Sequence, residues 1–410
     1  MTESRIRQTH PPTPGRPAGS AGEVFVTFLK LGLTSFGGPI AHLGYFRNEL
    51  VQRRAWCGED QYAQLLAICQ FLPGPASSQL GFSLGLMRAG WLGAVAAFTA
   101  FTLPSAALLF AFAVLLPQFS GAVAAAAIHG LKLVALAVVA HGVLGMSRNL
   151  CPDAARRTIA VAAAVVILVT GLAWIQLLVI VLSAGAGLAV CRGVEATSGG
   201  DLKLQYGTRT GRWLLALFIA LLVGLPLVAE QAEGLLAIAD IFYRAGALVF
   251  GGGHVVLPLL EESVVASGQM SSDTFLAGYG AAQAVPGPMF SFSAYLGASL
   301  TGDGGAVAGA ATALVAIFLP GFLLVAGFLP LWQALAGHAS AARAIAGVNA
   351  AVVGLLGAAL YEPVWTSAVR GPLDVAIALI GFTMLAVWRV SAILVVLWCV
   401  VGSAIGAFLM

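Results

Sequence analysis

The chain has 410 residues, of which 60% are hydrophobic and 9% are charged, and its formal net charge is +3. A mean hydropathy of +0.95 leaves too little polar surface to cover a fold in water, so the composition places the chain in a lipid bilayer. Anchoring at the cytoplasmic face explains the small positive charge better than an acidic partner does, and no nucleic-acid partner is expected.

Residues 1–22 are the low-complexity part of the sequence. They hold four prolines and three arginines and have no apolar core. We predict a disordered basic tail rather than a cleaved signal peptide, so the first apolar segment would direct the chain to the membrane.

Apolar segments that approach or exceed the length of a membrane span fill most of the remaining chain. In the first half they are predicted at 23–46, 60–87, 90–117, 126–147, 157–173 and 174–191. A basic loop and a linker helix at 213–229 occupy 192–235. In the second half the segments are predicted at 236–260, 274–299, 304–330, 343–361, 371–388 and 390–410. The expected fold is an all-α polytopic membrane protein with two homologous six-segment halves, 23–191 and 236–410, and about thirteen transmembrane segments that include broken helices.

The two halves repeat the same motifs. Phe36-Gly37-Gly38-Pro39 returns as Phe250-Gly251-Gly252-Gly253, and Pro73-Gly74-Pro75 returns as Pro286-Gly287-Pro288. A repeat of this length indicates a duplicated and fused domain rather than a solenoid. In a hydrophobic chain, duplication favours a transporter. An odd number of crossings before the second copy predicts inverted repeats, a common plan of secondary transporters.

The distribution of basic residues leaves the topology open. The loops that contain Arg156 and Arg209 are predicted to be cytoplasmic, yet Arg53 and Arg54 follow the first segment and would then lie outside. If the second segment of each half is instead a re-entrant hairpin, these arginines come inside, the basic tail goes outside and the two copies are parallel. Both arrangements remain alternatives at this point.

The proline-glycine-proline motifs are predicted to break a helix at membrane depth. Two prolines remove backbone donors and the glycine permits a sharp turn, so a new helix begins after each motif. Such backbone is tolerated in a bilayer only when it is buried in protein or lines a wet cavity. The new helix start offers free N–H groups beside serine hydroxyls, which is a natural anion site. A packing kink is the alternative, but the repetition favours function. The expected substrate-binding residues are Pro73, Gly74, Pro75, Ser77, Ser78, Pro286, Gly287, Pro288 and Ser291.

The glycine-rich motifs support the same picture. Gly37, Gly38, Gly251 and Gly252 would let another backbone or a ligand approach closely, and they would themselves interrupt their helices. A second pair of breaks would then face the first. Close helix packing explains these glycines equally well.

Charged residues inside apolar segments are costly and usually face partners or a water-filled path. Lys30 and Arg244 occupy matched positions, and Lys132 in the fourth segment has Asn349 as its counterpart. Snorkelling at the interface is an equal alternative for Lys30 and Arg244. Lys132 has apolar neighbours on both sides, so we expect it to hold an anion, and Lys132→Gln to abolish transport without loss of protein.

Acidic and histidine residues near the glycine motifs are candidates for coupling. Glu49, Glu261 and Glu262 follow the first segment of each half, and His42 and His254 titrate near neutral pH. The alternatives are solvated loop charges and packed polar histidines. No zinc-protease, nucleophile-elbow or P-loop motif occurs, so catalysis and ATP-driven pumping are not expected. The five cysteines form no pair typical of a disulfide or metal site, and no metal or cofactor is expected.

Several motifs in the same order resemble the bidomain chromate transporter family over about 23–410. They include Phe36-Gly37-Gly38-Pro39, Leu72-Pro73-Gly74-Pro75, Val255-Val256-Leu257-Pro258, Gln283-Ala284-Val285-Pro286-Gly287-Pro288 and Gly347-Val348-Asn349-Ala350-Ala351. This sequence departs from the family pattern at Asn48-Glu49 and at Arg54-Ala55-Trp56, which puts a coupling role for those loops in doubt.

The resemblance implies an exporter of chromate in the bacterial inner membrane that confers chromate resistance, with sulfate as the related anion. A tetrahedral dianion is compensated by helix N-termini, hydroxyls and a cation without a metal. An uptake carrier or exchanger for sulfate or another oxyanion is the closest alternative, and a membrane enzyme or scaffold is the alternative from another class. The driving ion and a homodimeric state are left open.

Overall fold

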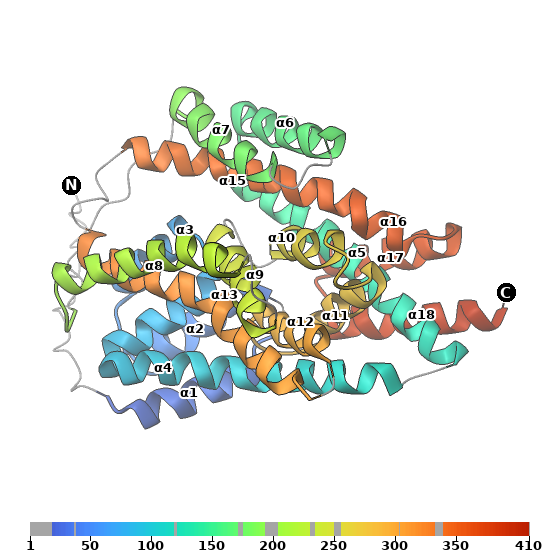
Figure 1. Ribbon diagram of the computed structural model, residues 1–410, viewed down its shortest axis with the longest axis horizontal. Coiled ribbons are helices and arrows are strands. Elements are labelled where there is room, and N and C mark those ends of the chain that lie inside the picture. The colour runs from blue at the N-terminus through green and yellow to red at the C-terminus, as the bar shows by residue number, and fades with distance from the viewer. Residues whose placement is uncertain are drawn as a thin grey trace, which may run out of the picture.

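The computed structural model describes residues 19–36, 38–118, 121–170, 175–192, 204–229, 234–249, 256–302, 304–332 and 339–409. Every regular element in these ranges is a helix. Figure 1 shows the helices packed into one layered bundle in which α4, α8 and α18 run roughly along the longest axis. The tail predicted at 1–22 lies largely outside the described residues.

The first two predicted segments of each half are broken where the glycine-rich and proline-glycine-proline motifs fall. In the first half they form α1 (Ala21–Thr34), α2 (Gly38–Phe46), the π-helix η1 (Arg47–Arg53), α3 (Glu59–Phe71) and α4 (Ala76–Leu115). In the second half they form α9 (Leu235–Leu248), α10 (Val256–Glu261), the π-helix η4 (Glu262–Ala266), α11 (Ser272–Ala284) and α12 (Phe292–Thr301), followed by α13 (Ala306–Phe328).

The remaining helices follow the predicted segments closely. They are α5 (Ala122–Leu150), α6 (Ala154–Thr170), α7 (Ile175–Val190), the linker helix α8 (Thr208–Ala229), α15 (Ala339–Ala359), α16 (Thr366–Ala368), α17 (Pro372–Ala386) and α18 (Ala392–Leu409). Short 3₁₀ turns η2 (Leu116–Gln118), η5 (Met289–Ser291) and η6 (Leu329–Leu331) and the π-helix η7 (Leu360–Trp365) lie between helices of both halves. One boundary differs from the prediction: the segments at 60–87 and 90–117 share the helix α4, which bends at Ala89 and Gly90 because Gly90 has a φ of +65°.

Five helical stretches in the described part of the chain are long and apolar enough to cross a membrane: Ala76–Gln118, Ala125–Leu150, Thr208–Ala229, Ala306–Leu331 and Ala339–Ala368. Shorter apolar helices occur at Leu178–Val190, Pro372–Ala386 and Ala392–Ala407. The motif breaks leave α1, α2, α3, α9, α10, α11 and α12 each shorter than a span. The count of thirteen therefore stays a prediction.

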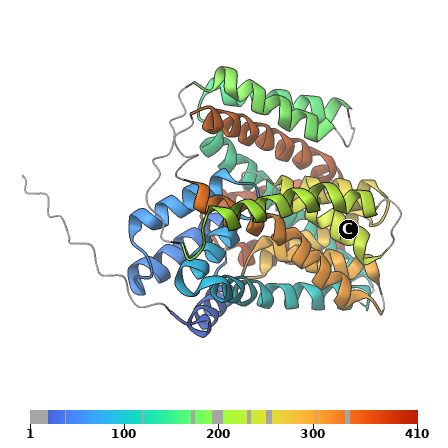
Figure 2. The ribbon, with the colours of Figure 1, turned by 60° about the vertical axis from the view of Figure 1, so that its left-hand side comes forward.

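One helix of each half, α5 or α15, packs on the last two helices of the other half. α15 of the second half packs on α6 and α7 of the first, while α5 of the first half packs on α17 and α18 of the second, and Figures 1 and 2 show α6 and α7 lying over α15. Glycines at matched positions make both contacts close: Gly347 lies against the backbone of Ser183 and Gly187, and Gly130 lies against Cys399 and Val400. Small residues at such crossings let backbones approach without lost side-chain packing.

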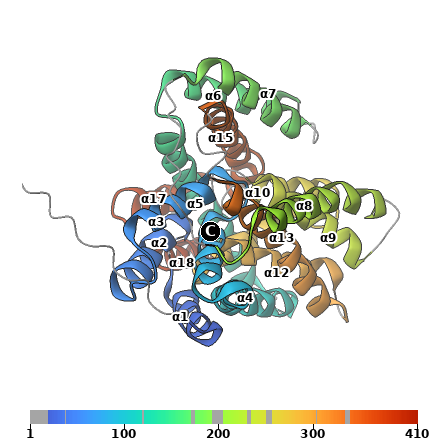
Figure 3. The same cartoon turned by 90° about the vertical axis from the view of Figure 1, so that its left-hand side faces the viewer.

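The first helix of each half also packs in a matched way within its own half. Gly32 of α1 lies against the carbonyl of Phe101 in α4, and Gly246 of α9 lies against the carbonyl of Ile317 in α13. Figure 3 shows α2 and α3 on one side of the bundle and α8 and α9 on the other. Apolar side chains such as Ile219 and Val223 of α8 face outward, which suits contact with lipid.

Candidate functional site: the crossing of the broken helices

The proline-glycine-proline loops meet the breaks of the opposite half. Gly74 N–H donates to the carbonyl of Val249 at 2.6 Å, and Gly287 N–H donates to the carbonyl of Ser35 at 3.0 Å. Ser35 and Val249 are the residues at which α1 and α9 end. Each loop therefore closes on the first break of the other half, and the two contacts are reciprocal.

The glycine of each loop has a conformation that suits no other residue. Gly74 has a φ of +123° and Gly287 a φ of +104°, values that L-residues with a Cβ rarely adopt. A Cβ on Gly74 would lie 3.0 Å from Gly321 Cα, and a Cβ on Gly287 would lie 2.9 Å from Ser105 Oγ. Glycine at these positions thus permits both the turn and the close approach of a helix from the opposite half, α13 at Gly74 and α4 at Gly287.

Side chains that the sequence reasoning missed fasten these loops. Gln79 Nε2 donates to the carbonyls of Pro73 at 2.9 Å and Gly321 at 3.0 Å. Ser105 Oγ and Ser291 Oγ lie 2.6 Å apart, and Ser291 Oγ also donates to the carbonyl of Pro288. Gln79 lies one turn after a predicted motif, which is a signal that could have been read. Ser105 gives no local signal, because only the folded chain brings it to the second half.

Several buried polar atoms around the crossing have no hydrogen-bond partner in the described part of the chain. They are Ser35 Oγ, both ring nitrogens of His42, Ser78 Oγ, Gln79 Oε1 and Thr102 Oγ1. The His42 ring lies edge-on to Phe101 at 5.4 Å, and the Phe101 carbonyl lies beside the turn at Gly287. Leaving such a group unpaired costs about 1–3 kcal/mol. Hydroxyl and imidazole donors of this kind suit the oxygens of an anion.

The serines after the first loop lie at the start of α4. Ser77 and Ser78 are both buried, and the helix begins at Ala76. Free N–H groups and the positive end of the helix dipole coincide there with the unpaired Ser78 hydroxyl. In the second half the matching start is tighter, because Ser291 and Ser293 both donate to backbone carbonyls.

Lys132 has a partner that the sequence analysis did not consider. Its side chain is buried, and Nζ lies 2.7 Å from Asp273 Oδ1 at the start of α11. Nζ also lies 3.4 Å from the carbonyl of Ser367. Asn349, the counterpart in α15, has a buried Oδ1 without a partner among the described residues. Anion binding by Lys132 stays a prediction, since its charge is compensated in this structure.

Comparison with known proteins gives the same two-part division. The family described as Chromate transporter matches residues 22–188 and again 236–406. This chain belongs to the chromate transporter family. It is a transporter and not an enzyme, and the resemblance seen in the sequence motifs is confirmed.

Relatives in the chromate transporter family span most of the chain. The chromate transport protein of Pseudomonas aeruginosa is 30% identical over 95% of this chain and 92% of its own length. The probable chromate transport protein of Synechococcus elongatus is 31% identical over 75% of each chain. The chromate transport protein of Cupriavidus metallidurans is 25% identical over 90% of this chain and 88% of its own length. No solved structure is significantly similar to this one.

In this chromate transporter the first half gathers cations around one carboxylate. Glu49 is buried in η1 and lies 2.7 Å from Arg53, 2.8 Å from Arg54 and 3.7 Å from Lys30. The hydrogen bond from Arg54, with the charges of Lys30 and Arg53, holds the pKa of the Glu49 carboxyl below its usual value despite burial. Glu49 is therefore ionised at neutral pH, and its carboxylate is an ion-pair partner of Lys30.

The equivalent region of the second half of the transporter is acidic instead. Arg244 lies 2.6 Å from Asp240 one turn earlier on α9. Glu261 ends α10 and Glu262 begins η4, and both lie outside the five helices long enough to span. Burial, with the charge of Glu261, raises the pKa of the Glu262 carboxyl to about 7. Burial and Glu362 raise the pKa of Glu261. The Glu262 carboxyl, one of the two predicted coupling groups, can therefore exchange a proton near neutral pH.

Four predicted residues, Gly37, Gly251, Gly252 and His254, lie outside the described part of the chain. Gly38 is described: it begins α2 with a φ of +74° and has open space where a Cβ would be. Groups of His, Cys, Asp and Glu that could hold a metal ion do not occur among the described residues.

Proposed function

We propose that this chain exports chromate from the bacterial cytoplasm across the inner membrane and so confers chromate resistance. The observation that carries the proposal is the pair of hydrogen bonds from Gly74 to Val249 and from Gly287 to Ser35. They support a single central site built from both halves, lined by buried donors suited to a tetrahedral dianion. The names of the relatives supply the substrate.

We infer that the transporter works by alternating access, because equivalent interfaces of its two halves differ. α11 packs closely on α5, because Gly280 lies against the carbonyl of Leu131 and Lys132 of α5 pairs with Asp273 of α11. The start of α11 also contacts α16, where Ser272 Oγ lies 3.0 Å from Ser367 Oγ. The equivalent helices α3 and α15, both wholly described, make no such packing. One interface is therefore closed while its counterpart is open.

The open interface carries the residues that would close it. Asp60 occupies in α3 the place of Asp273 in α11, the second residue of the helix, and is exposed. Asn349 occupies in α15 the place of Lys132 in α5 and has an unpaired buried oxygen. In the opposite state we expect Asn349 to meet Asp60 and Lys132 to leave Asp273. This exchange would expose the crossing first to one side of the membrane and then to the other.

Inverted repeats with thirteen crossings are the topology that this mechanism favours. The exchange of α5 and α15 between the halves supports a two-fold relation of the repeats. For coupling, Glu261 and Glu262 are the candidates that the charge arrangement favours, because burial raises the pKa of both carboxyls and the pKa of Glu262, at about 7, lies where a proton gradient acts. Proton-linked export is thus the form of the proposal that we would test first.

Chromate flux into inside-out membrane vesicles, with and without a pH gradient and with sulfate as competitor, tests the proposal. Accumulation that collapses with the gradient supports a proton-linked exporter. Accumulation only with an anion on the opposite side supports exchange, and cells made more sensitive to chromate by the protein would support uptake instead. Vesicles that accumulate no more chromate than vesicles without the protein would overturn export.

A further inference from the structure

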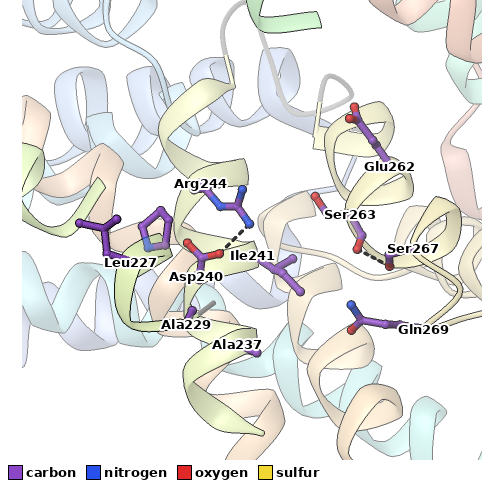
Figure 4. Close-up of a pocket in the computed structure, with 11 residues that line it drawn as sticks. Leu227, Ala229, Ala237, Asp240, Ile241, Arg244, Glu262, Ser263, Ser267 and Gln269 are labelled. Carbon is purple, nitrogen blue, oxygen red and sulfur yellow. Dashed lines mark hydrogen bonds and ion pairs between the residues drawn. The ribbon is translucent and has the colours of Figure 1, made fainter. Parts of the chain in front are cut away.

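A cavity of about 620 Å³ lies beside Arg244, and we call it the Arg244 cavity; its lining includes none of the residues that form the crossing of the loops. Figure 4 shows Asp240 and Arg244 of α9 on one wall and Glu262, Ser263, Ser267 and Gln269 on the opposite wall. Pro226, Leu227, Ala229, Ala237 and Ile241 complete its lining. The size is in the range of small-molecule sites.

Arg244 can bind a ligand in this cavity. Its side chain is 49% exposed, and Nη2 is the atom that contacts Asp240. A guanidinium has five N–H donors in a fixed fork, so further donors remain for an oxyanion. Asp240 is 5% exposed, and its other oxygen, Oδ1, is buried without a partner in the described chain. Asp240 thus balances the Arg244 charge while the cavity holds no anion.

The first half shows what the same framework does with a carboxylate. The turns after the two π-helices contain the same backbone hydrogen bond, which aligns the two halves here. Trp56 N–H donates to Leu50 O at 2.8 Å, and Met270 N–H donates to Val264 O at 2.9 Å. In this register Ser263 occupies the position of Glu49. Glu49 places its carboxylate 3.7 Å from Lys30, the counterpart of Arg244.

The second half therefore has a serine instead of a carboxylate at the position of Glu49, and the open cavity lies there. Resting on the proposed transport of oxyanions, we propose that the Arg244 cavity is a second binding site for a tetrahedral oxyanion, with the Arg244 guanidinium as its cationic ligand. The oxyanion takes the role that the Glu49 carboxylate has in the first half. Arg244 then binds the substrate with its remaining N–H donors while Nη2 stays paired with Asp240.

The polar groups across the cavity complete the site. Ser263 Oγ donates to the Leu259 carbonyl at 2.8 Å, and Ser267 Oγ donates to the Ser263 carbonyl at 2.7 Å. Rotation of either hydroxyl redirects its proton into the cavity, where the Gln269 amide also lies. These groups bind oxygen atoms without adding negative charge.

The charges that face Arg244 set the pH dependence of this site. Asp240 on α9 and Glu262 on η4 line the cavity, and Glu261 on α10 lies beside Glu262. The pKa of the Glu262 carboxyl is raised to about 7, so a fall in pH through neutrality removes a negative charge that repels the anion. We expect tighter binding at pH 6 than at pH 8, and Glu262→Gln to reduce this difference.

Sulfate and chromate binding to the purified full-length protein tests the inference. Ser263→Glu copies Glu49 into the cavity and should abolish one class of binding sites, and Arg244→Gln should weaken that class by roughly tenfold or more. Asp240→Asn removes the competing charge and should strengthen it. Arg192→Gln, which removes an exposed cation elsewhere, is the control for net charge. Each variant is first checked for a monodisperse gel-filtration peak.

The outcomes separate this inference from the proposed function. If the wild-type protein transports chromate but Ser263→Glu and Arg244→Gln leave the number and affinity of binding sites unchanged, the Arg244 cavity is not a substrate site while the transport proposal stands. If the wild-type protein neither binds nor transports either oxyanion, both proposals fall. Loss of one class of sites in Ser263→Glu, with retention in Arg192→Gln, supports the second site.

Discussion

Removal of Asp273 should destabilise the protein far more than removal of its partner. Lys132 is 1% exposed, and its other polar contact is the Ser367 carbonyl at 3.4 Å. Asp273→Ala therefore leaves a buried ammonium without a carboxylate. Breaking a buried pair in this way costs about 3–5 kcal/mol. The Asp273 side chain is 62% exposed, so water replaces part of the lost contact and we expect about 3 kcal/mol, the lower end.

Lys132→Met should have a much smaller effect. It removes the buried charge itself and leaves the Asp273 carboxylate to water, so the lost pair is worth about 1 kcal/mol or less. In the double variant the cost of Asp273→Ala should largely disappear, which gives a coupling energy of about 2 kcal/mol between the two sites.

Unfolding of the four proteins in one detergent, followed by intrinsic fluorescence against denaturant, measures this cycle. Asp60→Ala is the matched control, because Asp60 is also the second residue of its helix but is exposed. It reports the loss of an acidic residue from a helix start, about 0.5 kcal/mol. Equal destabilisation by Lys132→Met and Asp273→Ala, or strict additivity in the double variant, would refute this reasoning.

Three further predictions concern transport and pH. Gly74→Ala places a Cβ at a φ of +123° and 3.0 Å from Gly321 Cα, so chromate flux in vesicles should be lost. Gly44→Ala is the control, because Gly44 has open space around it, and it should keep wild-type flux. Equal flux in both variants would show that the loop tolerates distortion. Asn349→Lys puts a cation opposite Asp60 and should favour the opposite state, so flux should fall at an unchanged amount of protein, and unchanged flux would argue against the exchange of partners. The pKa of the Glu262 carboxyl is raised from 4.5 to about 7. Between these values the folded protein keeps a proton that the unfolded chain loses, so stability should fall as pH rises from about 5 to 7. Glu262→Gln should flatten that fall in a thermal unfolding series, and an identical slope in both proteins would contradict the assignment.

Internal repetition explains why much of the architecture could be predicted from the sequence. Pro73-Gly74-Pro75 and Pro286-Gly287-Pro288 interrupt helices through local backbone chemistry, which does not depend on distant contacts. The ends of α5 and α15 follow from runs of apolar residues, and both lie within a few residues of the predicted segments. Such features depend on residues that are close together in the sequence.

The partners across the halves could not be predicted in the same way. Asp273 reads as an ordinary acidic residue at a helix start, and its contact with Lys132 arises because α5 packs among helices of the second half. Ser105 likewise reaches Ser291 only in the folded chain. Gly130 and Gly347 carried a faint signal, since glycine at matched positions of two apolar helices indicates close crossing, but the sequence does not say which helix is crossed.

Chromate flux through liposomes that contain only the purified chain tests the central claim most directly. We predict that chromate crosses the membrane with the wild-type protein and with Gly44→Ala, and that flux is lost in Gly74→Ala and Gly287→Ala, because both loops must form for the halves to build one site. Wild-type flux no faster than that of protein-free liposomes would contradict chromate transport by this chain.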